Sequence, residues 1–404
     1  MRICLMARQF PVVSQTFVLN HAAGLLARGH EVVVVPIMRS DDEEFATDEF
    51  NAVIAATAPT PAPLGGGKLA RMAGGALRLA TADAPSRRFA LAKGDDFPLQ
   101  RVGLRLLIAS RLANAAPFDV LHAHFGPTGV AAVALRDAGV FDSPIVCSFH
   151  GYDANVIAQQ VPGIYEPMIG RAHVTAGTAF MRTVVENLGF PPGDVTVWPQ
   201  GVDTARFVPR PPRPADGTFR ALSVARLVDF KGLDISIRAV AAARSRVPGL
   251  RYTIIGEGER RDNLERLAKE LGVDDIVTFA GARSHDEVLA AFAHADVFLI
   301  TGRVDSEGQK EGQGVAPLEA AASGLPVVAA RAGGLTEVVV DGETGIVVEP
   351  ENPVAAAEAL VRLAGDAPLR TRLGTAGRAH VEANFSHAHS LDVIEGVYRS
   401  VGRR

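Results

Sequence analysis

The chain has 404 residues, of which 48% are hydrophobic and 21% are charged, and its formal net charge is −4. This composition is typical of a globular protein with two or three domains, and it excludes the disordered, collagen-like and disulfide-rich classes. The near balance of acidic and basic residues argues against a dedicated nucleic-acid binder. The first apolar run is too short for a signal-peptide core, and no apolar stretch of about 18 residues occurs. A cytoplasmic location is therefore expected.

The two cysteines, Cys4 and Cys147, each lie in a short apolar run. Two cysteines make neither a disulfide framework nor a zinc knuckle, and buried thiols of this kind behave as small hydrophobic residues. We therefore expect both side chains to lie in the core.

The first part of the chain alternates between short apolar runs and helical patterns. Runs at Ile3–Ala7 and Glu31–Ile37 flank a helical stripe that begins near Phe17 and ends at Gly29. Continuous apolar runs indicate strands buried on both faces, as in parallel sheets, and a strand, a helix and a strand within about 35 residues form a βαβ unit. Further strands are expected at residues 118–124, 144–148, 173–176 and 195–197.

Three stretches interrupt this alternation. Residues 41–49 carry six acidic side chains, and residues 55–67 are rich in Ala, Pro, Thr and Gly, so both are expected to be loop. From Lys68 to Arg111, nine basic residues stand against three acidic ones, a net charge of +6, with apolar residues between them at helical spacing. Either a solvated helix face or a reversible contact with anionic lipid fits this pattern.

A proline-rich segment marks the expected domain boundary. Residues 206–217 contain four prolines, which favours a stiff linker. The α/β pattern on either side predicts two Rossmann-like, doubly wound domains, residues 1–205 and 218–385, that face each other across a cleft. Residues 386–404 are expected to form a helix that packs back on the first domain. Strands of the second domain are expected at 219–224, 252–255, 276–279, 297–300, 326–329 and 345–348.

Several motifs of metal and phosphate chemistry are missing. No two aspartates are two residues apart, so a divalent cation held by paired carboxylates is not expected. Residues 65–68, Gly-Gly-Gly-Lys, are not followed by the Ser or Thr of a phosphate-binding P-loop. His122 and His124 have the spacing of two metal ligands on one strand face, but no third ligand is evident. Neither a metal nor another cofactor is therefore expected.

In the second domain, two cations flank a turn between a strand and a helix. Arg226 follows the strand expected at 219–224, and Lys231 stands at the entrance of the next helix. Ligands of open α/β sheets bind at this edge, and two cations beside a helix N-terminus suit a diphosphate without a metal. A solvated loop with an ordinary cation pair explains them equally well. Gly256 and Gly258, which follow the next strand, are by themselves more simply explained by a tight turn.

The most informative segment is the glycine-rich stretch Glu307–Pro326. It follows the strand expected at 297–300 and leads into a helix that is expected to begin near Gly314. Amides at a glycine-rich helix start are placed to bind a diphosphate. Glu311 precedes the helix and Glu319 lies within its early turns, so the two carboxylates are placed to accept hydroxyls of a sugar and of a ribose. Helix-dipole complementarity would explain an acid there, but not the number of glycines.

In the first domain, His150 and Gly151 follow the strand expected at 144–148. A histidine at the carboxyl end of a parallel strand lies at the edge where ligands bind, and a glycine beside it lets the backbone approach closely. The alternative is a loop histidine that caps a carbonyl group. We favour a functional role for His150.

Taken together in chain order, these motifs resemble those of the retaining family-4 glycosyltransferases, which have the two-Rossmann GT-B fold. The resemblance covers nearly the whole chain and is strongest from residue 198 to residue 348. The opening, Phe10-Pro-Val-Val-Ser-Gln-Thr-Phe17, further resembles the subgroup that makes exopolysaccharides such as colanic acid and amylovoran. The residues that carry the match are Phe149-His150-Gly151, Pro199–Asp203 with Phe207, Arg226 with Lys231-Gly232, Gly256-Glu-Gly258, Gly281, and Glu311 with Glu319, Ala320 and Gly324-Leu-Pro326.

By position, the resemblance implies a binding site for a nucleotide-sugar donor, with UDP as the expected nucleotide. Arg226 and Lys231 would hold the diphosphate, and Glu319 would take the ribose hydroxyls. Gly256 and Gly258 are also assigned to the donor site.

The same resemblance assigns residues to the chemistry at the donor sugar. Glu311 would contact the sugar, with the backbone amides of Gly312–Val315 nearby. His150 would contact the sugar from the other domain. Glu307 is the alternative acid, because a shift of register would put it in the place of Glu311.

The implied activity is the metal-independent transfer of a sugar, with retention of configuration, to a saccharide or a lipid-linked saccharide at the inner face of the cytoplasmic membrane. Two alternatives stay open. One is a sugar-nucleotide epimerase or a phosphorylase of the same fold. The other is a non-catalytic binding module, against which the presence of both acids and both cations argues.

Overall fold

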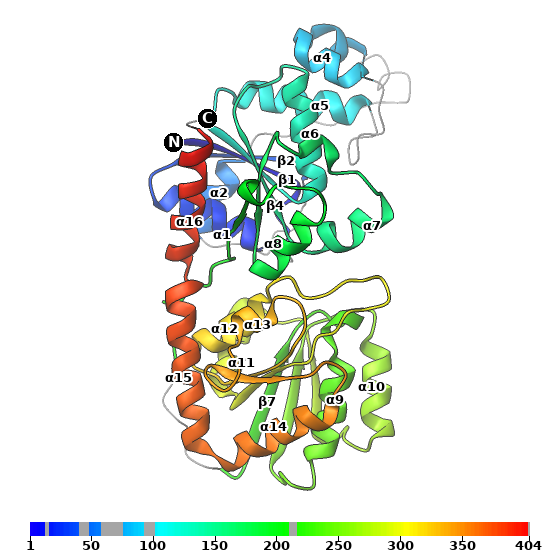
Figure 1. Ribbon diagram of the computed structural model, residues 1–404, viewed down its shortest axis with the longest axis vertical. Coiled ribbons are helices and arrows are strands. Elements are labelled where there is room, and N and C mark those ends of the chain that lie inside the picture. Colours follow the sequence, from blue (N-terminus) through cyan, green and yellow to red (C-terminus); the bar gives the residue numbers. More distant parts are fainter. Residues whose placement is uncertain (13–15, 40–47, 58–75, 93–101, 210–215, 403–404) are drawn as a thin grey trace. The chain divides into compact units, whose positions relative to one another are not determined.

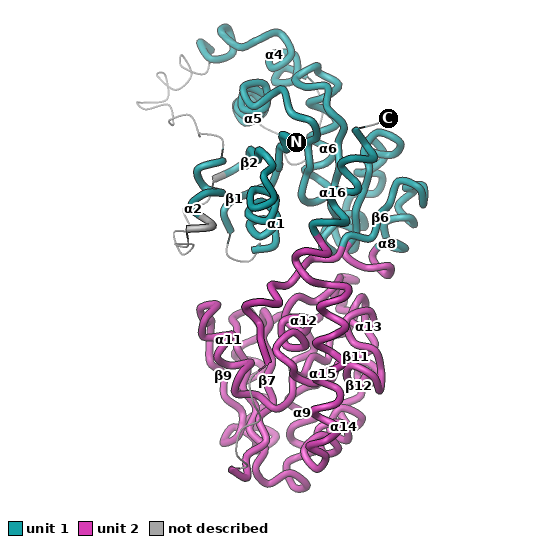
Figure 2. Tube along the Cα trace, turned by 90° about the vertical axis from the view of Figure 1, so that its left-hand side faces the viewer, with its two compact units in different colours: residues 1–176, 182–198, 391–404 teal, residues 177–181, 199–390 magenta. Residues whose placement is uncertain are grey.

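The computed structural model describes the chain except for residues 13–15, 40–47, 58–75, 93–101, 210–215 and 403–404. The described residues form two compact units, which Figure 2 distinguishes by colour. Unit 1 comprises residues 1–176, 182–198 and 391–404. Unit 2 comprises residues 177–181 and 199–390. Each unit contains a six-stranded parallel sheet with helices on both faces (Figure 1), so the expected doubly wound α/β class is confirmed.

The sheet of unit 1 has the strand order β2-β1-β3-β4-β5-β6. In the middle of this sheet Leu5 lies opposite Val34 on one side and His122 on the other. Strands β3 and β4 are buried along their whole length, which explains their continuous apolar character. The strands are β1 (Arg2–Phe10), β2 (Glu31–Arg39), β3 (Val120–His124), β4 (Ile145–Phe149), β5 (His173–Ala176) and β6 (Val195–Val197).

The helices of unit 1 come from both ends of the chain. Two of them, α8 and α16, begin with residues that belong to unit 2. The helices are α1 (Thr16–Ala27), α2 (Asp48–Ala55), α4 (Ala84–Leu91), α5 (Val102–Ala115), α6 (Gly126–Asp137), α7 (Ala158–Gln160), α8 (Ala179–Glu186) and α16 (His387–Val401).

Helix α16 completes the core of unit 1. Its buried side chains Ile394 and Tyr398 belong to the same apolar cluster as Leu5 of β1. The helix packs closely on α1, since a Cβ atom at Gly24 would lie 2.7 Å from a methyl carbon of Leu391. A side chain at residue 24 would therefore require the Leu391 side chain to move.

The sheet of unit 2 has the strand order β12-β11-β10-β7-β8-β9, so the carboxyl ends of its parallel strands lie at one edge. The strands are β7 (Phe219–Val224), β8 (Leu250–Ile255), β9 (Val277–Gly281), β10 (Val297–Ile300), β11 (Val327–Ala330) and β12 (Gly345–Val348). The helices are α9 (Leu233–Ala243), α10 (Arg261–Glu270), α11 (His285–His294), α12 (Val315–Ala322), α13 (Leu335–Val338), α14 (Pro353–Gly365) and α15 (Ala367–Asn384).

The segment before the proline-rich linker packs on unit 2. The Val202 N–H donates to the Phe385 carbonyl oxygen at 2.8 Å, and the His387 N–H donates to the Val202 carbonyl oxygen at 3.0 Å. Phe207 is only 2% exposed and lies in a core cluster of this unit. The structure therefore divides the chain at residue 199, ahead of the prolines, because these apolar side chains bury their surface on unit 2.

Smaller expectations can also be compared with the structure. Both cysteines are buried and unpaired, as expected. Part of the acidic stretch was wrongly expected to be loop, because α2 begins at Asp48. The rest of that stretch, residues 41–47, and most of the stretch 55–67 lie outside the described residues. Among the described residues, no helix combines the length and the apolar character needed to cross a membrane.

Candidate active site

The site residues predicted in unit 2 follow neighbouring strands at the carboxyl edge of the sheet. Arg226 follows β7, Gly256 follows β8, and the glycine-rich loop follows β10. Since β10, β7 and β8 are adjacent in the sheet, these three segments meet at one edge.

The two cations at this edge share one aromatic ring, and one of them is paired with a carboxylate. The Lys231 ammonium group forms an ion pair with the Glu311 carboxylate, and these side chains are 16% and 12% exposed. The same ammonium lies 5.0 Å from the centre of the Phe230 ring, and the Arg226 guanidinium lies 5.8 Å from it. Arg226 itself is exposed. The structure therefore brings Arg226, Lys231 and Glu311 together around Phe230.

Glycines let the loops at this edge approach each other. Gly232 has a φ of +63°, and a Cβ atom there would lie 1.9 Å from the Thr301 carbonyl oxygen. Gly256 has a φ of +136°, and a Cβ atom there would lie 1.9 Å from the Ala225 carbonyl oxygen. Gly258 is similarly close to the Leu227 carbonyl oxygen, at 2.5 Å. These contacts give Gly256 and Gly258 a packing role beside the loop that carries Arg226.

The glycine-rich loop is held in place before α12 begins. The Thr178 hydroxyl donates to the Gly312 carbonyl oxygen at 2.8 Å. The Gln313 side chain accepts from the Gln200 N–H at 2.8 Å and donates to the Gln200 carbonyl oxygen at 3.0 Å. Within the part of the chain that the structure describes, no group accepts from the backbone N–H groups of Gly312, Gly314 or Val315. Such open amides at a helix start form a binding site for an anion.

Glu319 lies in the second turn of α12 and is half-buried. Burial raises the pKa of its carboxyl group to about 8, and the positive charge of Arg206 opposes this shift. Among the described residues, none donates a hydrogen bond or forms an ion pair with this carboxylate. A buried carboxyl group without donors of its own can accept the paired hydroxyls of a diol, whose hydrogen bonds favour its ionised form.

The alternative acid, Glu307, has different surroundings. Its side chain is exposed on a turn, where the Glu307 N–H donates to the Asp305 carboxylate at 3.0 Å. In the described part of the chain its carboxylate meets no cation, whereas Glu311 meets Lys231. The geometry therefore favours Glu311 as the acid beside the cations.

In unit 1, His150 follows β4 and is held by aromatic packing. Its ring centre lies 4.4 Å from that of Phe17 and 4.7 Å from that of Phe125. The Asp153 carboxylate fixes the loop, since it accepts from the N–H of His150 at 3.0 Å and from the N–H of Gly126 at 2.8 Å. Burial lowers the pKa of His150 well below its usual value, and the neighbouring His124 lowers it further. His150 is therefore a neutral hydrogen-bonding group rather than a cation.

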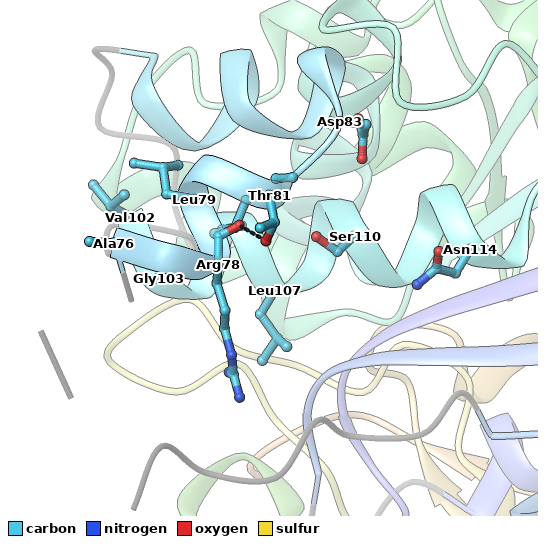
Figure 3. A pocket seen from close by; sticks show the side chains of 12 residues that line it. Ala76, Arg78, Leu79, Thr81, Asp83, Val102, Gly103, Leu107, Ser110 and Asn114 are labelled. Atoms are coloured by element: carbon cyan, nitrogen blue, oxygen red, sulfur yellow. Dashed lines mark hydrogen bonds between the residues drawn. The ribbon is translucent and has the colours of Figure 1, made fainter. Parts of the chain in front are cut away.

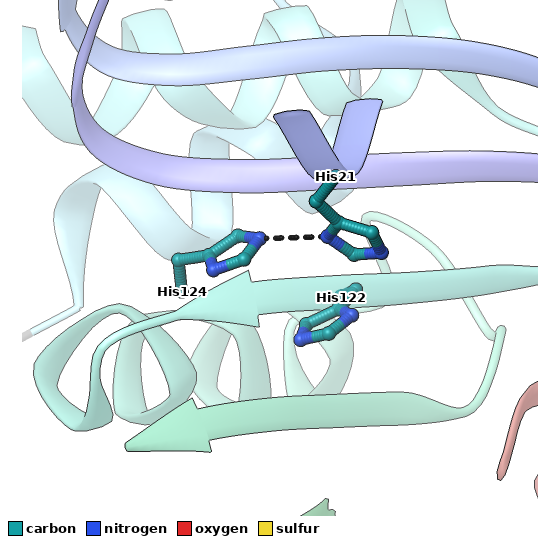
Figure 4. A group of neighbouring side chains, drawn as sticks. All are labelled: His21, His122 and His124. Atoms are coloured by element: carbon teal, nitrogen blue, oxygen red, sulfur yellow. Dashed lines mark hydrogen bonds between the residues drawn. The ribbon is translucent and has the colours of Figure 1, made fainter. Parts of the chain in front are cut away.

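His21, His122 and His124 form a second set of buried polar residues in unit 1 (Figure 4). The ring nitrogens His124 Nδ1 and His150 Nε2 lie 3.1 Å apart, and His124 Nε2 lies 3.1 Å from His21 Nδ1. His21 and Tyr398, which also joins this set, were not predicted as site residues. The only signal for His21 in the sequence was its place among the apolar residues of the expected helix, where the structure buries it.

Three of these histidines lie close enough to raise the question of a metal. One ring nitrogen from each of His21, His122 and His124 lies within 4.8 Å of the others, so His21 is the third residue that the sequence did not reveal. The rings of His122 and His124 are stacked, however, with their planes within 6° of parallel and their centres 4.7 Å apart. Lone pairs in two parallel planes do not converge on one ion. The arrangement therefore fits a hydrogen-bonded cluster better than a metal centre.

A pocket of about 600 Å³ lies elsewhere in unit 1, between α5 and the segment that precedes α4 (Figure 3). None of its lining residues is a predicted site residue. Its lining combines apolar and polar side chains: Ala76, Arg78, Leu79, Thr81, Ala82, Asp83, Val102, Gly103, Leu106, Leu107, Ser110 and Asn114.

Comparisons with known proteins agree with this fold. Residues 14–206 match the family described as Glycosyltransferase Family 4, and residues 206–380 match the family described as Glycosyl transferases group 1. The putative colanic acid biosynthesis glycosyltransferase WcaL of Salmonella typhimurium is 31% identical over 364 residues, which is 88% of each chain. The amylovoran biosynthesis glycosyltransferase AmsK of Erwinia amylovora is 29% identical over 398 residues, which is 96% of each chain.

Solved structures show the same fold. The structure of HepE from Anabaena in complex with UDP and glucose has a TM-score of 0.69 and 18% identity, and covers 99% of this chain and 100% of that one. Sucrose-phosphate synthase from Thermosynechococcus elongatus has a TM-score of 0.72 and 20% identity, and covers 99% of each chain. The fold and the site define a glycosyltransferase of the GT-B class. The chain belongs to glycosyltransferase family 4.

Proposed function

We propose that the protein transfers a sugar from a nucleotide-sugar donor, with UDP as the nucleotide, to a saccharide or lipid-linked saccharide during synthesis of an exopolysaccharide or another cell-surface glycan. The observation that carries this proposal is the grouping of Arg226, Lys231 and Glu311 with the open amides of Gly312–Val315 at one sheet edge. The exopolysaccharide biosynthesis for which WcaL and AmsK are named, and the UDP and glucose bound to HepE, support it.

The chemistry follows from the charge that develops on the donor. The bond between the anomeric carbon and the diphosphate oxygen breaks, and negative charge appears on the leaving diphosphate. Arg226, Lys231 and the amides at the start of α12 are fixed where they stabilise that charge. We propose front-face attack with retention, in which the acceptor oxygen bonds to the anomeric carbon and its proton passes to the leaving phosphate. This step needs no metal.

In this proposal His150 and Glu311 act on the sugar. His150 is neutral, so it exchanges hydrogen bonds with sugar hydroxyls rather than pairing with phosphate. Glu311 accepts from another sugar hydroxyl. Glu319 accepts from the ribose hydroxyls, whose hydrogen bonds favour the ionised form of its buried carboxyl group.

We also propose that the protein contacts anionic lipid at the inner face of the cytoplasmic membrane through α4 and its flanking residues. Arg87 and Arg88 are exposed on α4. Large apolar side chains are exposed nearby, with Leu77 at 65%, Leu91 at 56% and Val102 at 50% exposure. Exposed cations interleaved with exposed apolar side chains suit an anionic lipid surface.

Not all of the basic segment is free for such a contact. Arg105 is buried and donates to the Ala92 carbonyl oxygen, and Arg111 is buried and donates to the Pro36 carbonyl oxygen at 2.8 Å. These two arginines stabilise the packing of α5. Lys68, Arg71, Lys93 and Arg101 lie outside the described residues.

The function is tested by incubating the purified protein with a panel of UDP-sugars and GDP-sugars and measuring thermal stabilisation and hydrolysis of each donor. The expected result is one sugar nucleotide that both stabilises the protein and is slowly hydrolysed. Conversion of the nucleotide sugar into an epimer without an acceptor would instead indicate an epimerase. The absorption spectrum of a lysine-bound cofactor would indicate a phosphorylase, and binding without any turnover would indicate a binding module.

A further inference from the structure

A continuous line of hydrogen-bonding side chains runs through the core of unit 1 and ends at His150. All of its members behind His150 are at most 5% exposed. From His150 to Tyr398 the links are His150 Nε2 to His124 Nδ1, His124 Nε2 to His21 Nδ1, and His21 Nε2 to Tyr398 OH, each at 3.1 Å. From Tyr398 onward they are Tyr398 OH to His122 Nδ1 at 2.6 Å, His122 Nε2 to Ser148 Oγ at 2.6 Å, and Ser148 Oγ to Thr175 Oγ1 at 2.5 Å.

Burial keeps the four histidines of this line neutral. It is the first cause of the lowered pKa of each ring, and the neighbouring histidines add to it for three of them. A neutral imidazole has one N–H and one lone pair, so it donates through one nitrogen and accepts through the other. Whether one ring donates or accepts therefore determines whether the next ring donates or accepts.

Tyr398 joins the two halves of the line. Its hydroxyl lies between His21 Nε2 and His122 Nδ1, and the described residues offer it no third partner. If the hydroxyl accepted from both rings, its own buried proton would have no acceptor, which typically costs about 1–3 kcal/mol. Tyr398 therefore accepts from one ring and donates to the other, so the direction is the same on both sides.

This geometry allows two arrangements of the protons. When the bonds point toward His150, all four histidines carry their proton on Nδ1. When the bonds point away from His150, all four carry it on Nε2. The proton on His150, which is proposed to contact the donor sugar, is thus tied to the proton on His122 in the core.

We propose that this line ties the tautomer of His150 to the tautomers of His124, His21 and His122, and that Tyr398 of α16 is its positioning residue. The role in catalysis rests on the proposed function, because it needs His150 to contact the donor sugar. A sugar hydroxyl that meets His150 then finds a donor or an acceptor that is set before it binds. Loss of the Tyr398 hydroxyl uncouples His21, His124 and His150 from His122.

The experiment is ¹⁵N NMR of the whole protein with ¹⁵N-labelled histidine, in which the ring-nitrogen shifts report the tautomer. Signals are assigned from single His→Gln variants. We expect His21, His122, His124 and His150 to share one tautomer in the unmodified protein. We expect Tyr398→Phe to abolish this agreement and to shift the ring signals of His150, although residue 398 does not touch His150.

Tyr252→Phe is the matched control. Tyr252 is also fully buried and its hydroxyl bonds to Ser223 Oγ at 2.7 Å, but it lies in unit 2. This variant should leave all four histidine signals unchanged. If Tyr398→Phe does not fold, Ser148→Ala interrupts the line at its other end and should shift the signals of His122 and His150.

Activity gives a second readout. Tyr398→Phe should lower kcat about tenfold and leave the donor KM within about threefold, which is the low end of the effect of partners that orient metal-ligating histidines. Tyr252→Phe should stay within about threefold in both.

Three results would overturn the inference: mixed tautomers among the four histidines of the unmodified protein, unchanged His150 signals in Tyr398→Phe, or one tightly bound zinc per chain whose removal shifts His122 and His124. The NMR result does not depend on turnover. Shared tautomers in a protein without transferase activity would reject the proposed function alone, and mixed tautomers in an active transferase would reject the line alone.

Discussion

The Lys231 ammonium group is paired with the Glu311 carboxylate in unit 2. The two groups are assigned to different parts of the donor, the diphosphate and the sugar, yet each neutralises the other at the sheet edge. A diphosphate that binds Lys231 therefore competes with Glu311 for the same cation. We expect this competition to release the carboxylate toward the sugar when the donor binds.

The pairing of Lys231 with Glu311 predicts different effects for the loss of Glu311 and the loss of Glu319. Glu319→Ala should weaken binding of free UDP and of the UDP-sugar alike, by about ten- to a hundredfold, because the ribose is common to both and its hydroxyls lose the group that accepts their hydrogen bonds. Glu311→Ala should not weaken binding of UDP, since Lys231 loses a competitor, but it should reduce sugar transfer. Isothermal calorimetry and a transfer assay measure the two effects. Glu307→Ala is the control, and if it alone abolished transfer, Glu307 would be the acid that contacts the sugar.

Arg226 and Lys231 should raise kcat because they stabilise the negative charge on the leaving diphosphate. Arg226→Ala and Lys231→Ala should each lower kcat by about 10²–10³, the usual effect of removing one preorganised donor. Arg226 is exposed, so its loss should leave Tm unchanged, whereas loss of Lys231 leaves a poorly exposed Glu311 carboxylate unpaired and should lower Tm. Activities of both variants within about threefold of the unmodified protein would sink the diphosphate assignment.

Chelation should not stop the reaction. The charge on the diphosphate is met by Arg226, Lys231 and the amides that begin α12, so we expect full transfer after dialysis against EDTA. The assay compares the dialysed protein with and without added Mg²⁺ or Mn²⁺. Loss of activity in EDTA that either ion restores would mean that the diphosphate site includes a metal.

Glu319 should make stability depend on pH. Burial raises its pKa from 4.5 to about 8, so between these values the folded chain holds a proton that the unfolded chain has released. The resulting stabilisation is complete below pH 4.5 and is lost as the pH rises through 8. Glu319→Gln, neutral at every pH, should therefore gain in Tm relative to the unmodified protein between pH 5 and pH 9. Scanning calorimetry at both values tests this, with Glu307→Gln as an exposed control, and an equal Tm difference at both would contradict it.

Membrane contact predicts binding to vesicles that rises with the fraction of anionic lipid and falls with salt. Charge reversal at Arg78, Arg87 and Arg88 should weaken sedimentation with anionic vesicles and spare donor hydrolysis. Reversal of three exposed arginines of unit 2, Arg238, Arg283 and Arg372, controls for net charge. Equal sedimentation of the unmodified protein with neutral and anionic vesicles would reject the contact.

The local pattern of apolar residues in the sequence was sufficient to predict the strands of both sheets. All twelve strands of the described residues were predicted, because strands of a parallel sheet are buried on both faces and their sequences are continuous apolar runs. The cluster in unit 2 followed from the same fact, since residues after neighbouring parallel strands share one edge. Arg226, Lys231 and Glu311 could therefore be grouped from their places in the sequence.

The polar line in unit 1 could not be predicted in this way. His122 and Tyr398 are 276 positions apart, and Tyr398 and His21 are 377 apart, so no local period relates them. Arg105 and Arg111 were counted among solvated charges for a similar reason. Their burial depends on carbonyl groups of Ala92 and Pro36, which only the folded chain brings within reach.

The place of α16 in the core of unit 1 affects the order in which the newly synthesised chain can fold. Residues 1–198 leave the ribosome long before Leu391–Val401, whose side chains fill the gap beside α1 and β1. Until that helix arrives, the part of this apolar cluster that Ile394 and Tyr398 cover stays exposed, which favours binding of a chaperone or transient collapse. Unit 2, which can close without residues 391–401, is ready to fold first, so the N-terminal unit of this protein is expected to be the second to mature.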